Sequence, residues 1–109
     1  MAAFARAQDK LQAEGITTIA ASTNPLEKAR ETVAEQGLTF AVGYGLPLKQ
    51  TARDLGAFYD AQRGVLHGTG FVIRPHRRIA VAQYSSGPIG RLVWQDVLGL
   101  VQFYKKQAQ

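Results

Sequence analysis

The stretch FARAQDKLQAEGITTIAA, residues 4–21, decides the fold class of this chain. Its apolar residues recur at helical spacing up to Leu11, and Gly15 suits the left-handed turn after a helix, so we expect a helix over residues 2–14. Residues 16–21 then combine isoleucines with β-branched threonines, which is typical of a parallel strand covered on both faces. A helix followed by a buried strand predicts an α/β fold.

Capping and breaking residues mark the next two elements. Asn24 suits a helix N-cap, Pro25 fits the first turn, and Glu27 completes a capping box, so we expect a helix to begin here. Gly37 is predicted to end this helix, and residues 38–42 are typical of a short extended segment. The alternation of helix and strand therefore continues.

The second half of the chain predicts a short helix, a hairpin and a final helix. The short helix begins near Leu48 and ends at Gly56. Residues 70–73 and 79–84 are rich in β-branched and aromatic side chains, and the polar residues 74–78 between them predict a β-hairpin with a five-residue connection. The final helix carries one apolar face, formed by Val93, Val97, Leu100, Val101 and Tyr104.

Length and composition are those of an ordinary globular protein. The 109 residues suffice for a single small domain over residues 1–109, with 46% hydrophobic and 19% charged residues. The net charge is +5, and the only tight basic group is Arg74, Arg77 and Arg78 with His76. Aromatic residues do not alternate with these arginines, so we expect a solvated hairpin tip and no nucleic-acid partner.

Membrane, metal and disulfide chemistry are not indicated. No run reaches the roughly eighteen apolar residues of a membrane span, and the amino terminus does not resemble a signal peptide, so we expect a cytoplasmic protein without a membrane partner. The sequence has no cysteine, which excludes disulfides and thiolate metal sites. His67 and His76 are too few to predict zinc, and no cofactor is expected.

The order helix, strand, helix, strand, helix, hairpin, helix resembles the later part of a thioredoxin-like domain of the peroxiredoxin type. Five phrases are similar to a peroxiredoxin-like branch of the redoxin (AhpC/TSA) family. They are FARAQDKLQAEGI (4–16), LTFAVGYG (38–45), TGFVI (69–73), YSSGPIGRL (84–92) and DVLGLV (96–101). The resemblance covers nearly the whole chain and implies an α/β, thioredoxin-like sandwich with a C-terminal β-hairpin and helix.

In this family a cysteine at the start of the first helix reduces peroxides or exchanges dithiols. The matching position would precede Met1, so the resemblance implies an N-terminally truncated domain without its redox centre. The arginine that the family carries before the hairpin falls at Gly68 or Thr69, with His67 as the nearest basic side chain. No catalytic residue is therefore assigned.

The resemblance also implies that a central strand is missing between residues 16–21 and 71–73. Two rows of backbone polar groups would then lack partners, at about 1–3 kcal/mol for each group that is buried. An upstream segment of the natural protein, a closing-up of the flanking strands, or a second copy of the chain would relieve this. We expect a homodimer.

A candidate binding surface is expected around residues 67–70 and 84–91. Serines, glycines and Arg91 precede the last helix, where an anion such as phosphate or carboxylate would be favoured. The alternative is a helix entry built from capping serines and Pro88. The candidate ligand-binding residues, for a small molecule or anion that the sequence does not name, are His67, Thr69, Tyr84, Ser85, Ser86 and Arg91.

Two functions remain open. The first is a peroxiredoxin-like oxidoreductase, of the alkyl hydroperoxide reductase and thiol-specific antioxidant family, that is inactive as a thiol peroxidase in this form. The second is a non-enzymatic binding or assembly module on a thioredoxin-like scaffold. Trp94 and Phe103 on the last helix are expected to pack internally or to mark a dimer surface.

Overall fold

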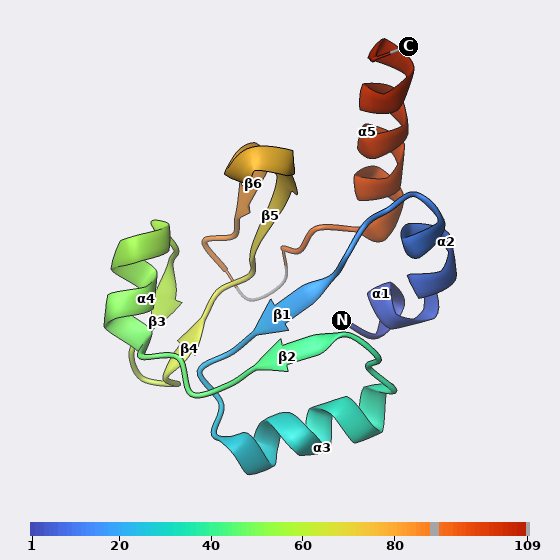
Figure 1. Cartoon of the computed structure of the whole chain (residues 1–109). Helices are drawn as coiled ribbons and strands as arrows, with labels where there is room; N and C mark the ends of the chain where they lie inside the picture. Colours follow the sequence, from blue (N-terminus) through green and yellow to red (C-terminus); the bar gives the residue numbers. More distant parts are fainter. Residues whose placement is uncertain (88–89, 109) are drawn as a thin grey trace.

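The computed structural model describes residues 1–87 and 90–108 and has a mixed α/β architecture (Figure 1). The helices are α1 (Ala2–Arg6), α2 (Gln8–Ala13), α3 (Leu26–Gln36), α4 (Leu48–Leu55) and α5 (Trp94–Gln107). The strands are β1 (Ile19–Ala21), β2 (Ala41–Gly43), β3 (Tyr59–Asp60), β4 (Val65–Leu66), β5 (Thr69–Arg74) and β6 (Arg78–Tyr84). The predicted α/β class is confirmed.

The described strands form three separate two-stranded sheets. β1 and β2 are parallel, while β3 with β4 and β5 with β6 form antiparallel hairpins. Figure 1 shows β1 lying between β2 and the β5–β6 hairpin, with β1 and β5 running in opposite directions. Within the part of the chain that the structure describes, β1 and β5 are not paired with each other.

The predicted first helix is divided in two. Ala7 leaves helical geometry, with φ −97° and ψ 6°, and separates α1 from α2. The buried side chain of Gln8 stabilises this bend, since its Nε2 donates to the Phe4 carbonyl at 3.0 Å and to the Thr18 hydroxyl at 3.1 Å. Gly15 takes the predicted left-handed conformation, with φ 75°.

The strand expected over residues 16–21 is shorter and more exposed than predicted. Only Ile19–Ala21 are in β1, and the Ile19 side chain is 75% exposed. The prediction that both faces are covered is therefore wrong. The physical reason is that β1 has a described neighbour on one edge only, so no adjoining strand extends a packed surface over Ile19.

The start of α3 differs from the predicted cap. The N-cap is Pro25, with φ −67° and ψ 163°, and no side chain caps the helix. Asn24 instead belongs to the preceding turn: its N–H bonds to the Ser22 hydroxyl at 3.2 Å, and its carbonyl accepts the Gly45 N–H at 2.7 Å. Gly37 ends α3 as predicted, with φ 62°.

The later elements agree with the sequence more closely. α4 ends at Gly56, which has φ 74°. The predicted hairpin forms as β5 and β6, but its connection is the three-residue turn Pro75–Arg77 rather than five residues. The preceding hairpin of β3 and β4 was not predicted, because its strands of two residues each are too short to show a periodic pattern.

The chain encloses a small core for its length. The buried apolar side chains belong to Ala7, Leu11, Ala29, Leu38, Ala52 and Val97. The accessible surface is 7876 Å², whereas a compact monomer of this length exposes about 5,900 Å². The radius of gyration is 14.6 Å, against about 13 Å for a compact domain. The surplus surface includes the second half of α5, which projects from the rest of the molecule (Figure 1).

Candidate functional site

Strand pairing brings several of the predicted binding residues together. Thr69 and Tyr84 are cross-strand partners at the base of the β5–β6 hairpin, and Ser85 follows directly. The Ser85 N–H donates to the Gly68 carbonyl at 2.8 Å, which continues the ladder by one more pair. His67 lies just before this point, and its N–H donates to the Phe58 carbonyl at 2.9 Å.

The polar atoms of this cluster bond within the chain. The Thr69 hydroxyl donates to the His67 carbonyl at 3.1 Å, and the Tyr84 hydroxyl donates to the Leu55 carbonyl at 2.8 Å. The Ser85 hydroxyl donates to the Gly87 carbonyl at 2.7 Å and accepts the Gly87 N–H at 3.2 Å. The Ser85 bonds hold the turn to Gly87, while the Thr69 and Tyr84 bonds join the hairpin base to His67 and Leu55, so these three hydroxyls are engaged within the chain.

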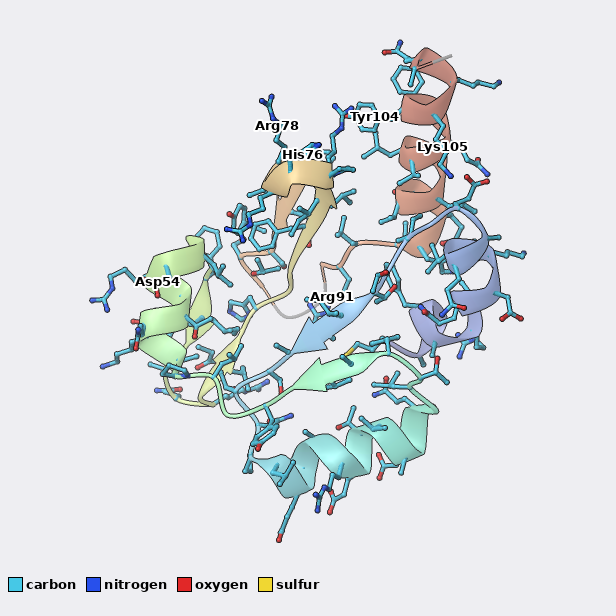
Figure 2. The ribbon with its side chains drawn as sticks, viewed as in Figure 1. Asp54, His76, Arg78, Arg91, Tyr104 and Lys105 are labelled. Atoms are coloured by element: carbon cyan, nitrogen blue, oxygen red, sulfur yellow. The ribbon has the colours of Figure 1, made fainter. Side chains whose placement is uncertain are left out.

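The last helix begins later than the residues of the expected anion site. α5 begins at Trp94 with Val93 as N-cap and no side-chain cap, so Ser85 and the exposed Ser86 do not cap this helix. The Arg91 guanidinium donates to the Gly90 carbonyl at 2.7 Å (Figure 2). Pro88, the other residue of the predicted helix entry, lies outside the described residues.

Two glycines let the chain pack on β5 after the loop. A Cβ on Gly68 would overlap the Gly90 carbonyl oxygen and the Arg91 guanidinium, and one on Gly70 would overlap the Leu92 side chain. The returning segment therefore lies against the start of β5. Glycines two apart, at the start of a predicted strand, are the sequence signal for this close approach.

A groove lies between β1 and β5. It has a volume of about 770 Å³. The segment Ile16–Ile19 forms one wall and Phe71–Arg74 the opposite wall, while α5 lies along it. Its apolar lining residues include Phe4, Ile16, Val72, Leu92, Val97 and Val101. None of the binding residues predicted from the sequence lines this groove.

The two walls present backbone hydrogen-bonding groups to the groove. In β1, the Ser22 N–H donates to Gly43 at 3.1 Å, so by alternation Ala20 also faces β2 and Ile19 faces away. In β5, the Ser85–Gly68 bond places the next paired residues at Gly70 and Val72, so the N–H and C=O of Phe71 point away from β6. Ile19 and Phe71 thus provide unpaired strand edges from opposite sides.

Basic side chains gather at one end of the groove. The Arg74 guanidinium lies 4.4 Å from the centre of the Tyr104 ring. The Lys105 ammonium donates to a Glu14 carboxylate oxygen at 2.8 Å and to the Glu14 carbonyl at 2.8 Å. Figure 2 shows Tyr104 and Lys105 on α5, with His76 at the neighbouring hairpin tip. This end is therefore cationic, with a single carboxylate among the groove-lining residues.

The Lys105 hydrogen bond lowers the pKa of the Glu14 carboxyl below its ordinary value of 4.5, and a hydrogen bond from Gln102 adds to the effect. A lowered pKa in the folded state means that the contact stabilises the fold above the ordinary pKa of the carboxyl. This stabilisation is lost as pH falls through the lowered value. The ion pair between Glu14, after α2, and Lys105, near the end of α5, is therefore intact at neutral pH.

Similarity to known proteins, metal-ligating clusters and membrane-spanning helices assign no function to the described residues. No protein-family model matches the chain, and no curated protein matches it. The described residues contain no group of three or more His, Cys, Asp or Glu side chains able to hold a metal ion. Among the described helices, none has both the length and the apolarity needed to cross a membrane.

The substitution Gly68→Ala tests the packing of the returning segment on β5. We expect a loss of about 1–3 kcal/mol in the free energy of unfolding, because the new methyl group displaces Gly90 and Arg91. Urea unfolding followed by circular dichroism measures it. The control is Gly99→Ala on α5, where a Cβ meets nothing within 4 Å and helix propensity raises stability. Equal effects of the two variants would contradict the packing.

Proposed function

We propose that this chain is a peroxiredoxin-like protein of the redoxin (AhpC/TSA) family that reduces no peroxide in this form and acts as a binding module. The family proposal is supported by the five phrases quoted from the sequence and by the order of the elements. The proposed thioredoxin-like sandwich is supported by the parallel β1–β2 pair, the antiparallel β5–β6 hairpin and the helices beside them. A cytoplasmic location is proposed from the sequence.

The absence of peroxidase activity follows from chemistry. Peroxide reduction in this family needs a thiolate that attacks the peroxide oxygen and is regenerated from a sulfenic acid or disulfide. The chain holds no cysteine, and Met1 contributes its only sulfur atom. A methionine sulfur is not regenerated by dithiols without a dedicated reductase, so Met1 does not support turnover.

The binding function is supported by one observation above the others, the groove between the edges of β1 and β5. It combines apolar side chains with unpaired backbone groups, and ligand pockets in proteins share this combination of apolar walls and a few convergent polar groups. Thr69, Tyr84 and Ser85 lie at the base of the β5–β6 hairpin, and β5 forms one wall of the groove. The hydrogen bonds of these residues therefore help to hold that wall in place.

We expect no catalytic peroxide consumption. The chain is mixed with hydrogen peroxide and excess dithiothreitol, and residual peroxide is measured over time. The expected rate equals the buffer blank after at most one equivalent of peroxide per chain, consumed by Met1. Continued consumption over many equivalents by metal-free protein would contradict the proposal.

Binding in the groove is tested with the apolar anionic dye 8-anilinonaphthalene-1-sulfonate. We expect saturable binding with a blue shift of dye emission, since the dye enters an apolar groove with a cationic end. Val101→Asp, which puts a carboxylate on the α5 wall, is expected to weaken binding by about fivefold or more. Val93→Asp is the matched control, because Val93 is exposed and does not line the groove. Equal binding to both variants would place the dye elsewhere.

We also propose that two copies of the chain associate through the exposed face of α5 that carries Phe103. Phe103 is 54% exposed there, whereas Trp94 is half-buried with the Lys10 ammonium 5.3 Å from its ring centre. Light scattering during size-exclusion chromatography is expected to give a dimer at low micromolar concentration and a monomer for Phe103→Gln. The control Lys106→Gln should stay dimeric. A monomeric parent chain would contradict the dimer.

A further inference from the structure

We propose that the groove between β1 and β5 binds an extended strand of another polypeptide, apolar along its length and acidic at the end that lies beside Arg74. This inference rests on the proposed binding function and specifies its ligand. It joins three observations: two facing strand edges, apolar walls on both sides of the groove, and a cationic end.

The facing edges specify an extended backbone. Outward-pointing groups of Ile19 and Phe71 approach the groove from opposite sides, and a strand laid between them would bond to both. Because β1 and β5 run in opposite directions, such a strand is parallel to one and antiparallel to the other (Figure 1). It would connect two of the separate two-stranded sheets into one mixed sheet.

The walls specify apolar side chains on the strand. Val72, Val97 and Val101 line the groove, so one face of an inserted strand would pack against them. Ile19 and Ile73 also line it but are 75% and 63% exposed, so burying them adds to the apolar area gained. β-branched side chains suit this position, since they pack well on a pleated surface.

The charges specify an acidic end and disfavour a second copy of this chain. Within the described residues, no carboxylate lies within ion-pair distance of Arg74, and the Glu14 carboxylate is held by Lys105. His76 and Arg78 lie at the adjoining hairpin tip (Figure 2). Two copies paired groove to groove would bring their cationic ends, each with an Arg74, together, so the local charge disfavours a second copy as the occupant.

The chain has exposed surface that a partner could cover. It exposes 7876 Å², about 2,000 Å² more than a compact monomer of its length. An inserted strand would cover part of this surplus, since Ile19 and Ile73 line the groove and are among the exposed side chains.

The test uses two capped probe peptides, acetyl-Asp-Val-Thr-Val-Thr-Val-amide and acetyl-Val-Thr-Val-Thr-Val-Asp-amide, each with a fluorescent label. The direction of the strand is set by which of them binds. We expect one probe to bind the full chain saturably by fluorescence anisotropy. Replacing its Asp by Lys should weaken binding by about tenfold. Methylating its alternate backbone nitrogens should abolish binding, because the ladder to β1 or β5 is lost.

The protein variant Arg74→Glu supplies the reciprocal change. It is expected to reverse the preference, so that the Lys probe binds better than the Asp probe. Both probes are compared on the same variant, whose folding is checked by circular dichroism, so a change in stability does not imitate the reversal. Arg53→Glu on α4 is the matched control, with the same change in net charge away from the groove, and should keep the preference for Asp.

Each other outcome overturns the inference. Failure of both probes to bind while the dye still binds in a Val101-dependent manner removes the strand ligand and leaves the binding function standing. Failure of both the probes and the dye removes both. Equal binding of the N-methylated probe shows that the strand edges are not used, and an unchanged preference in Arg74→Glu shows that the cationic end is not used. A fall in the fraction of bound probe as the concentration of the chain is raised identifies a second copy as the occupant.

Discussion

Backbone amides and carbonyls along the facing edges of β1 and β5 need hydrogen-bond partners, and no described strand supplies them. Water must therefore reach both edges, which keeps the space between them open and leaves the nearby side chains in contact with solvent. The small, alanine-rich core and the enlarged surface follow from the same condition. The helices accordingly lie beside small separate sheets of two strands each rather than on one continuous sheet.

Local chemistry explains which parts of the fold were predictable. Gly37 and Gly56 end their helices in the left-handed conformation, as their sequence positions indicate, because a glycine reaches that region at little cost. The hairpin of β5 and β6 was also visible as two β-rich runs around a polar turn. The N-cap of α3 was predicted wrongly. Asn24 can either cap a helix or take part in a turn, and in this chain it bonds with Ser22 and Gly45 in the turn before the helix.

Features that depend on distant parts of the chain were not predictable in the same way. Residues 16–21 have the composition of a strand that is buried on both faces. Burial also requires that other segments pack against both faces, and composition alone does not show whether such segments exist. Ile19 is accordingly exposed. The ligand site predicted around Ser85 stays a prediction, and the hydroxyls of Thr69, Tyr84 and Ser85 donate to backbone carbonyls of the chain. The groove itself arises from residues far apart in sequence, which periodicity does not bring together.

The turn at the tip of the β5–β6 hairpin has a strained backbone conformation. His76 and Arg77 both have positive φ, at 67° and 63°, although neither is glycine. Left-handed backbone at a residue with a Cβ costs on the order of 1 kcal/mol, and a turn containing Asn-Gly would avoid much of it. The present residues instead keep an imidazole and a guanidinium at the apex between Arg74 and Arg78. Substitutions that relax this turn would make the hairpin easier to form while diluting the positive potential it displays.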